Sequence, residues 1–273
     1  MFSPHRPRNF FEATTTTLGL IYDTTVKSLR NAHGNPIIGL LLTFVQALVM
    51  AGGFFLMFWV MGIKSSPIRG PYVIYLLTGV FMFMNHTAAI GAVAGAPRAS
   101  SSMMLHGPMN PAIAIAASAL TVLYKQTLIF SVMIYGYHVL VEPVHFENLP
   151  AAMGMFMLAW FSGISVGLIF YAATPWAPTP MGLLTTVYQR ANMIFSGKLF
   201  VANVLSAKML AMFSWNPLFH ITDQTRGFVF INYEPYFTSV SYPLKVSMVL
   251  FMIGLMGEFV TRQSISASWG AGK

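Results

Sequence analysis

Residues 149–173 read LPAAMGMFMLAWFSGISVGLIFYAA, a segment that contains no charged side chain. Its length exceeds the roughly 20 residues that an α-helix needs to cross the hydrocarbon core of a membrane. Gly154, Gly163 and Gly167 are small residues that allow a neighbouring helix to pack closely against such a span. The segment therefore predicts a transmembrane helix.

The composition of the whole chain extends this prediction. Hydrophobic residues make up 56% of its 273 residues and charged residues 8%, whereas a soluble domain usually carries about 25% charged residues. The net charge of +8 comes from scattered Lys and Arg, which is typical of membrane-helix flanks and not of nucleic-acid binding. The sequence contains no cysteine, which excludes disulfides, thiolate metal sites and cysteine nucleophiles.

Five further apolar stretches accompany the first one, so we expect an all-α polytopic membrane protein with six transmembrane helices. The predicted spans cover about residues 36–63, 72–93, 111–141, 149–173, 179–197 and 240–260. An even number of spans puts both chain ends on one side of the membrane. Because four Lys and Arg residues precede the first span, we expect that side to be the cytoplasm. One transmembrane domain, residues 36–273, accounts for the chain after its N-terminal segment.

Residues 1–35 form the most polar part of the chain and are treated as a separate N-terminal cytoplasmic segment. The apolar residues of FFEATTTTLGLIYDTTVKSLR recur there near helical spacing. This pattern predicts an amphipathic helix that lies along the membrane surface. The other interpretation is a short helix that faces solvent without a partner. We see no apolar core or cleavage site of a signal peptide.

Arg190 lies in the fifth predicted span, where a guanidinium persists only when it faces the protein interior or a wet cavity. Tyr188, Gln189 and Asn192 are its neighbours, and together they form a polar patch that could line a passage. Alternatively, the span begins later and Arg190 reaches the edge of the membrane.

The segment GAPRASSSMMLHGPMNP, residues 95–111, joins the second and third predicted spans on the cytoplasmic side. Two interpretations stay open for it. It contains a helical turn that docks into a partner protein, or it is a plain connector.

Residues 198–240, between the fifth and sixth predicted spans, are as apolar as a membrane segment but contain too many breaks for one span, and we expect a helical hairpin over 203–228. They predict two short helices, about 203–213 and 217–226. Asn216 caps the second helix, with Pro217 at its first position. Non-helical backbone at membrane depth must be shielded by protein or must line water. We therefore expect a re-entrant or interfacial hairpin at the outer face, before the last span.

Four polar side chains of the second short helix are placed to interact. His220 and Gln224 share a face at spacing i, i+4. Asp223 is placed to pair with Arg226 at spacing i, i+3. These side chains make the hairpin a candidate functional site.

The sequence lacks the short motifs of nucleotide hydrolysis and of common hydrolases, namely GxxxxGK[ST], HExxH and GxSxG. Its seven His residues lie far apart and show no ligand spacing. If the protein moves a substrate with the energy of ATP, another chain must hydrolyse the nucleotide.

The pattern SGKLFVANVLSAKMLAMFSWNPLFHITDQTRGFVF, residues 196–230, resembles the region before the last span in permease subunits of ABC-2-type exporters, particularly those for capsular polysaccharide and O-antigen. That family shows a Ser-Gly-x-aromatic-aromatic element, then Asn-Pro-Leu, a nearby His, and an Arg followed by Gly or Phe. The matching residues here are Ser196, Gly197, Leu199, Phe200, Asn216, Pro217, Leu218, His220, Arg226, Gly227 and Phe228. Lys198 departs from the pattern, because the family usually has an apolar residue there.

The resemblance implies a homodimeric permease in the bacterial inner membrane, with both termini cytoplasmic and no bond chemistry of its own. A separate nucleotide-binding subunit would bind ATP and Mg, so no cofactor is expected in this chain. The cargo would be a lipid-linked polysaccharide. In a Gram-negative source, periplasmic and outer-membrane export proteins would continue its path.

The resemblance also implies roles for particular residues: some contact the ATPase, some shape an outer gate, and some line the passage. The candidates for ATPase coupling are Arg98, Ser100, Ser101 and His106. The candidates for the periplasmic gate are Trp215, Asn216, Pro217, His220, Asp223 and Arg226. The candidates for the translocation passage are Trp59, Phe81, Phe83, Tyr188, Gln189 and Arg190.

Other functions are left open by these residues. An ABC-2 exporter could carry a different cargo, such as a drug or a teichoic-acid-like polymer. A membrane-embedded transferase could use His220 and Asp223 as acid–base groups. Proton-coupled transport is disfavoured, because Glu258 lies at the end of the last predicted span and no carboxylate lies within one.

Overall fold

The structure of the protein is a computed structural model that describes residues 10–31, 35–60, 67–97 and 110–270, and every regular element in these ranges is a helix. The elements are α1 (Phe10–Asn31), α2 (Pro36–Val60), α3 (Tyr72–Ala94), α5 (Pro111–Leu140), α6 (Leu149–Ala173), α7 (Pro178–Phe195), the 3-10 helix η1 (Ala202–Val204), α8 (Ala207–Phe213), α9 (Pro217–Val229) and α10 (Ser241–Gly270). The predicted all-α class is confirmed for this part of the chain.

Asparagine and proline together define where two long helices begin. The Asn110 side chain accepts a hydrogen bond from the N–H of Ala112 at the start of α5, and Asn148 accepts one from Ala151 at the start of α6. Proline follows in the first turn of each helix. Its missing N–H is harmless there, because the first N–H groups of a helix have no helical partner.

In the part of the chain that the structure describes, four helices are long and apolar enough to cross a membrane: α3, α5, α6 and the part Ser241–Ser264 of α10. They match the second, third, fourth and sixth predicted spans. The first predicted span is covered by α2, in which the apolar helical stretch Ile37–Met50 is shorter than those of the four helices above. The fifth is covered by α7, whose 18 residues include Thr, Gln and Arg side chains that lower its hydropathy.

The central helix of the bundle is α3, which is buried along most of its length and packs against α5, α6 and α9. Helix α6 also packs against α10. A methyl group on Gly163 would collide with the carbonyl oxygen of His86, and one on Gly167 would lie 2.9 Å from Cβ of Val93. The predicted close packing is therefore confirmed at these two glycines, whereas Gly154 faces open space.

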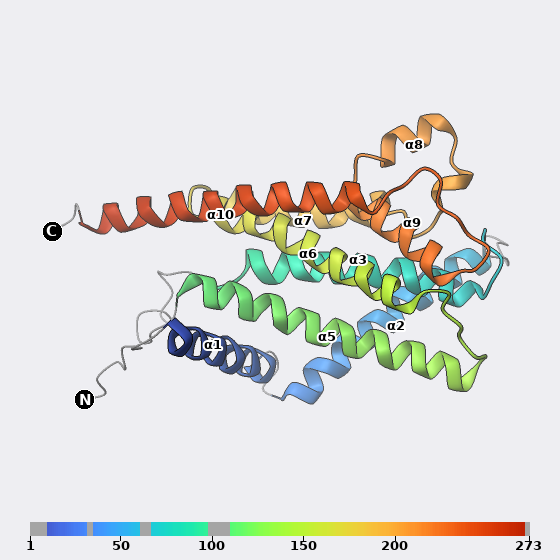
Figure 1. Cartoon of the computed structure of the whole chain (residues 1–273), viewed down its shortest axis with the longest axis horizontal. Helices are drawn as coiled ribbons and strands as arrows, with labels where there is room; N and C mark the ends of the chain where they lie inside the picture. The colour runs from blue at the N-terminus through green and yellow to red at the C-terminus, as the bar shows by residue number, and fades with distance from the viewer. Residues whose placement is uncertain (1–9, 32–34, 61–66, 98–109, 271–273) are drawn as a thin grey trace.

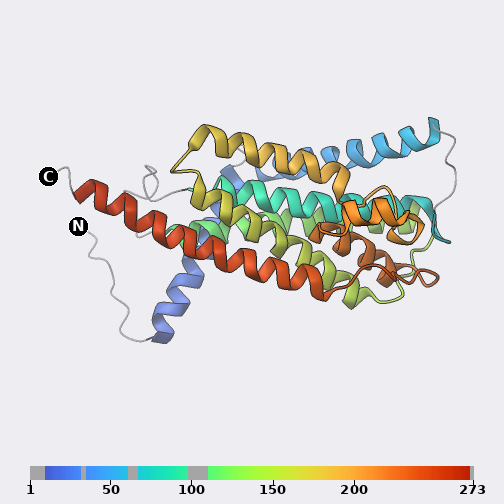
Figure 2. The same ribbon diagram turned by 90° about the horizontal axis from the view of Figure 1, so that it is seen from above.

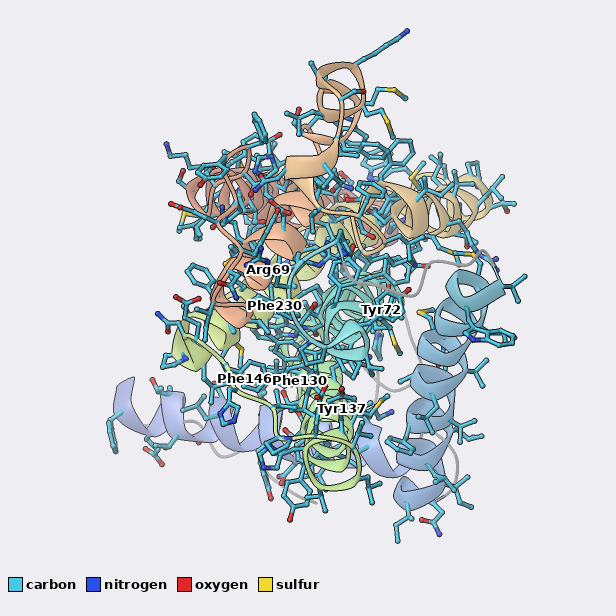
Figure 3. The ribbon with its side chains drawn as sticks, turned by 90° about the vertical axis from the view of Figure 1, so that its right-hand side faces the viewer. Arg69, Tyr72, Phe130, Tyr137, Phe146 and Phe230 are labelled. Carbon is cyan, nitrogen blue, oxygen red and sulfur yellow. The ribbon has the colours of Figure 1, made fainter. Side chains whose placement is uncertain are left out.

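Most of the long helices run roughly along one axis, whereas α2 crosses them obliquely and α1 lies across one end of the bundle against α5 (Figures 1, 2 and 3). The predicted N-terminal helix is therefore present. Its Phe11, Leu18 and Tyr22 side chains are exposed and form no part of the core. At the opposite end from α1 and from the C-terminal end of α10 lie α8 and α9 (Figure 1).

Candidate functional site

The helix α9 has a polar sequence and a buried position. Residues 218–226, which include His, Asp, Gln and Arg, are all buried. The helix begins as predicted, since Oδ1 of Asn216 accepts the N–H of Leu218 at 3.0 Å and Pro217 occupies the first turn. Burying so many polar groups is costly unless each group finds a hydrogen-bond partner. Those partners define the site.

The Arg226 side chain is fully buried and bonded to backbone carbonyl groups. Its Nη1 donates to the carbonyl oxygens of Gly197 at 2.9 Å and Phe200 at 2.6 Å, and Nη2 donates to that of Lys198 at 2.6 Å. The guanidinium also lies 4.2 Å from the ring centre of Tyr75 on α3, where a cation is attracted to the aromatic face. We term these five residues the Arg226 clamp. The clamp joins α9 to the segment after α7 and to α3.

Two glycines make room for the Arg226 clamp. Gly197 has a φ of 68°, in the left-handed region that favours glycine. On α3, a methyl group at Gly79 would lie 2.6 Å from the carbonyl oxygen of Lys198 and 2.8 Å from Nη2 of Arg226. Gly79 and Tyr75 were not predicted from the sequence, because α3 is apolar on all sides and no pattern marks the face that meets the clamp.

Asp223 is buried and accepts three hydrogen bonds. Its Oδ1 accepts the N–H of Ala202 at 3.0 Å and the hydroxyl of Tyr233 at 2.6 Å, and Oδ2 accepts the hydroxyl of Thr238 at 2.8 Å. Burial, followed by the nearby carboxylate, raises the pKa of Tyr233. The predicted ion pair with Arg226 is wrong for these two described residues, because each charge finds its partners on segments outside α9.

His220 and Gln224 share a face of α9, as predicted, and both bond to the segment before α10. His220 accepts the N–H of Ser239 on Nδ1 at 3.1 Å, while Nε2 lies 2.8 Å from the carbonyl oxygen of Ser214. This arrangement suits a neutral ring that carries its proton on Nε2. Burial lowers the pKa of His220, and the Ser214 carbonyl opposes that shift. Because the backbone engages both ring nitrogens, neither one is directed at a substrate.

Asn216 fastens the start of α9 to α7. Its Nδ2 donates to Oδ1 of Asn192 and to the carbonyl oxygen of Phe195, each at 2.9 Å. The preceding Trp215 is exposed, and its carbonyl oxygen accepts the hydroxyl of Tyr242 on α10 at 2.7 Å. The Trp-Asn-Pro run thus links α7, α9 and α10, and the structure brings all six predicted gate residues to one region.

Lys198 is 1% exposed, and its Nζ lies 3.8 Å from the ring centre of Phe83 on α3. Burial lowers the pKa of Lys198 from 10.5 to about 8. Phe81, on the same helix, is buried and packs edge-on against Phe130 at a centre distance of 4.9 Å. Two aromatic residues predicted to line the passage, Phe81 and Phe83, therefore lie in the packed interior of this chain.

The other predicted passage residues lie on α2 and α7, and two of those on α7 pack against α3. Trp59 on α2 is exposed. On α7, Tyr188 packs against ring side chains of α3 and α6, and Nε2 of Gln189 donates to the carbonyl oxygen of Thr87 at 2.9 Å. Arg190 is exposed. One side of α7 thus faces the bundle, while Arg190 points away from it.

The residues predicted for ATPase coupling, Arg98, Ser100, Ser101 and His106, lie outside the described residues. Among the residues that are described, no group of three or more His, Asp or Glu side chains is arranged to hold a metal ion.

No protein-family model and no curated protein matches this sequence. The fold itself defines the class: a helical protein whose described residues include four helices long and apolar enough to span a membrane. Its most extensive buried polar network in the described part of the chain surrounds α9.

Proposed function

We propose that this chain is the transmembrane permease subunit of an ABC-2-type exporter that moves a lipid-linked surface polysaccharide across the bacterial inner membrane. The observation that carries the proposal is the Arg226 clamp. Gly197 and Arg226 belong to separate elements of the family pattern and stand 29 residues apart, yet they are hydrogen-bonded at 2.9 Å. This contact supports the resemblance, because the matching elements form one structural unit.

The placement of α9 is compatible with a gate. In the proposed topology α2, α3, α5, α6, α7 and α10 are the six spans, and α1 lies along the cytoplasmic surface. The hairpin of α8 and α9 would then stand at the outer mouth, since it lies at the end opposite α1 (Figure 1). Exposed apolar side chains on α2, α7 and α10 supply surface for lipids and for a second copy of the permease.

The mechanism that we propose uses the clamp as a coupling element. Closure of a separate ATPase would pull on α1 and on the segment before α5, and the spans would shift relative to one another. Because the clamp holds the end of α7 to α9, a displacement of α7 would be passed to the hairpin. The passage would then open outward, and the chain would perform no bond chemistry.

Deleting the gene in its native host and restoring it from a plasmid tests this function. We expect the deletion to remove polysaccharide from the cell surface and to leave polymer inside the cell, with restoration reversing both effects. Unchanged surface polysaccharide would contradict the cargo, and a drug or another polymer retained by the deletion strain would indicate the alternative exporter. Loss of polymer synthesis itself would indicate a transferase.

A further inference from the structure

A polar cavity of about 820 Å³ lies beside α9, at the end of the molecule that bears the hairpin. Figure 3 shows this end facing the viewer, with Phe230 marking the start of the segment that follows α9. Its lining comes from α9, from the residues just before α6, from η1 and from the segment between α9 and α10. The lining residues that matter to its chemistry are Glu147, Asn203, Gln224, Tyr233, Glu234 and Tyr236.

The cavity is lined by hydrogen-bond acceptors and aromatic rings. Two carboxylates, Glu147 and Glu234, line it together with carboxamides and the rings of Tyr233 and Tyr236. No Lys, Arg or His is among the described residues that line it. Such a surface favours ligands that donate hydrogen bonds, such as hydroxyl and ammonium groups, and repels anions.

The walls of the cavity are held in place by hydrogen bonds. Nδ2 of Asn203 donates to the carbonyl oxygen of Glu234 at 2.7 Å, and its Oδ1 accepts the N–H of Tyr236 at 3.3 Å. The hydroxyl of Tyr233 donates to Asp223 at 2.6 Å. The N–H of Asn148 donates to the carbonyl oxygen of Phe228 at 2.9 Å. The cavity is therefore preorganised and not a gap between loose loops.

Gln224 supplies an acceptor group that the protein itself leaves unused. Gln224 is 9% exposed, and its Nε2 donates to the carbonyl and the hydroxyl oxygen of Thr238, at 2.8 Å and 3.0 Å. The Thr238 carbonyl can only accept, so the amide nitrogen must lie on that side. Gln224 lines the cavity, and within the described part of the chain its Oε1 has no hydrogen-bond partner.

We propose that this cavity binds a short segment of neutral or amine-bearing saccharide. Sugar hydroxyls would donate to Gln224 and the carboxylates, an amine would pair with Glu147 or Glu234, and a sugar ring would stack on a tyrosine. The volume lies within the roughly 300–1,000 Å³ of small-ligand pockets. The role of the saccharide as cargo rests on the proposed export function, whereas its binding to the cavity does not.

The test is calorimetric titration of the purified full-length chain in lipid nanodiscs with defined trisaccharides. The probes are chitotriose, which is neutral, its fully deacetylated form, which carries amines, and trigalacturonate, which is anionic. We expect the first two to bind and trigalacturonate to bind at least about tenfold more weakly.

The matched variants are the double substitution Glu147→Gln with Glu234→Gln, and Glu142→Gln, which removes a carboxylate outside the cavity. The double variant should weaken binding of the amine probe by about tenfold or more and leave chitotriose largely unaffected, because an amide oxygen still accepts from hydroxyls. Glu142→Gln should change neither. Gln224→Met should weaken binding of both probes.

The cavity proposal would be overturned if neither chitotriose nor its deacetylated form bound the folded chain, or if trigalacturonate bound more tightly than both. It would also be overturned if Glu142→Gln weakened binding of the amine probe as much as the double variant does. The export assay on the deletion strain decides the proposed function separately. If the protein binds these sugars but its deletion leaves surface polysaccharide unchanged, the binding-site proposal stands and the exporter proposal is wrong.

Discussion

Nη2 of Arg226 and the carbonyl oxygen of Lys198 lie 2.6 Å apart, although 28 residues separate them in the chain. A buried guanidinium held by carbonyl dipoles and by an aromatic face needs no carboxylate partner to offset part of its desolvation cost. The five donors of arginine suit this arrangement, because they reach several carbonyl groups from one planar head. The clamp therefore depends on the shape of the side chain as well as on its charge.

Arg226→Lys should destabilise the protein by about 3 kcal/mol or more, because lysine keeps the charge but leaves carbonyl groups in the clamp unpaired. Thermal unfolding in detergent, monitored as the loss of monodisperse protein, measures the change. Arg262→Lys is the matched control, since Arg262 is exposed and forms only a 3.8 Å pair with Glu258 one turn away. Equal melting of the two variants would contradict the structural role of the clamp.

Gly79→Ala should cost about 1–3 kcal/mol, because the added methyl group meets backbone of the clamp that cannot move aside. Gly154→Ala is the control on another membrane helix, where a methyl group meets nothing within 4 Å. That control should be neutral or slightly stabilising, since alanine favours a helix over glycine by about 0.5–1 kcal/mol. Comparing melting temperatures is sufficient, and an unaffected Gly79→Ala would show that α3 does not approach the clamp so closely.

Lys198 should make stability depend on pH. Folding lowers the pKa of its amine from 10.5 to about 8, so the unfolded chain binds more protons than the folded chain between those values. Stability should rise as pH increases through that window, while below pH 8 the cost of this burial is full and constant.

Lys198→Met should therefore raise stability at pH 7 by on the order of 2 kcal/mol and flatten the rise toward alkaline pH. Lys208→Met, at an exposed position on α8, serves as the control and should do neither. A Lys198→Met variant that melts below the wild type at pH 7 would show that contacts of the ammonium group outweigh its desolvation.

Helix ends and fold class could be predicted from residues whose effect is local. Asn216 and Pro217 define the start of α9 through contacts within its first turn, so this boundary was correct. The preceding helix begins at Ala207 instead of 203, because Ser206 caps it and residues 202–204 form a separate 3-10 turn. Both boundaries follow from short-range hydrogen bonds.

The partners of buried charges could not be predicted in the same way. Spacing along one helix suggested that Asp223 would pair with Arg226. It could not show that the Tyr233 hydroxyl and the carbonyl of Lys198 would approach from other segments. Similarly, Phe81 and Phe83 were assigned to a passage although α3 is packed on all sides. These contacts depend on tertiary packing, and an all-round apolar helix carries no pattern that reveals it.

Arg190→Ala should leave folding nearly unchanged, within about 0.5 kcal/mol, because the residue is exposed on α7. Under the proposed function it should nonetheless reduce export several-fold, measured as surface polysaccharide per cell. ATPase association should persist. Normal export would show that Arg190 only reaches the membrane edge.

Purification of the tagged full-length chain from its native membranes, with assay of bound ATPase, addresses the exporter proposal itself. We expect one subunit with a GxxxxGK[ST] motif to co-purify in a fixed ratio and to hydrolyse ATP. A monodisperse chain that carries no nucleotide-binding subunit and no ATPase activity, from cells that display the polysaccharide, would contradict the proposal.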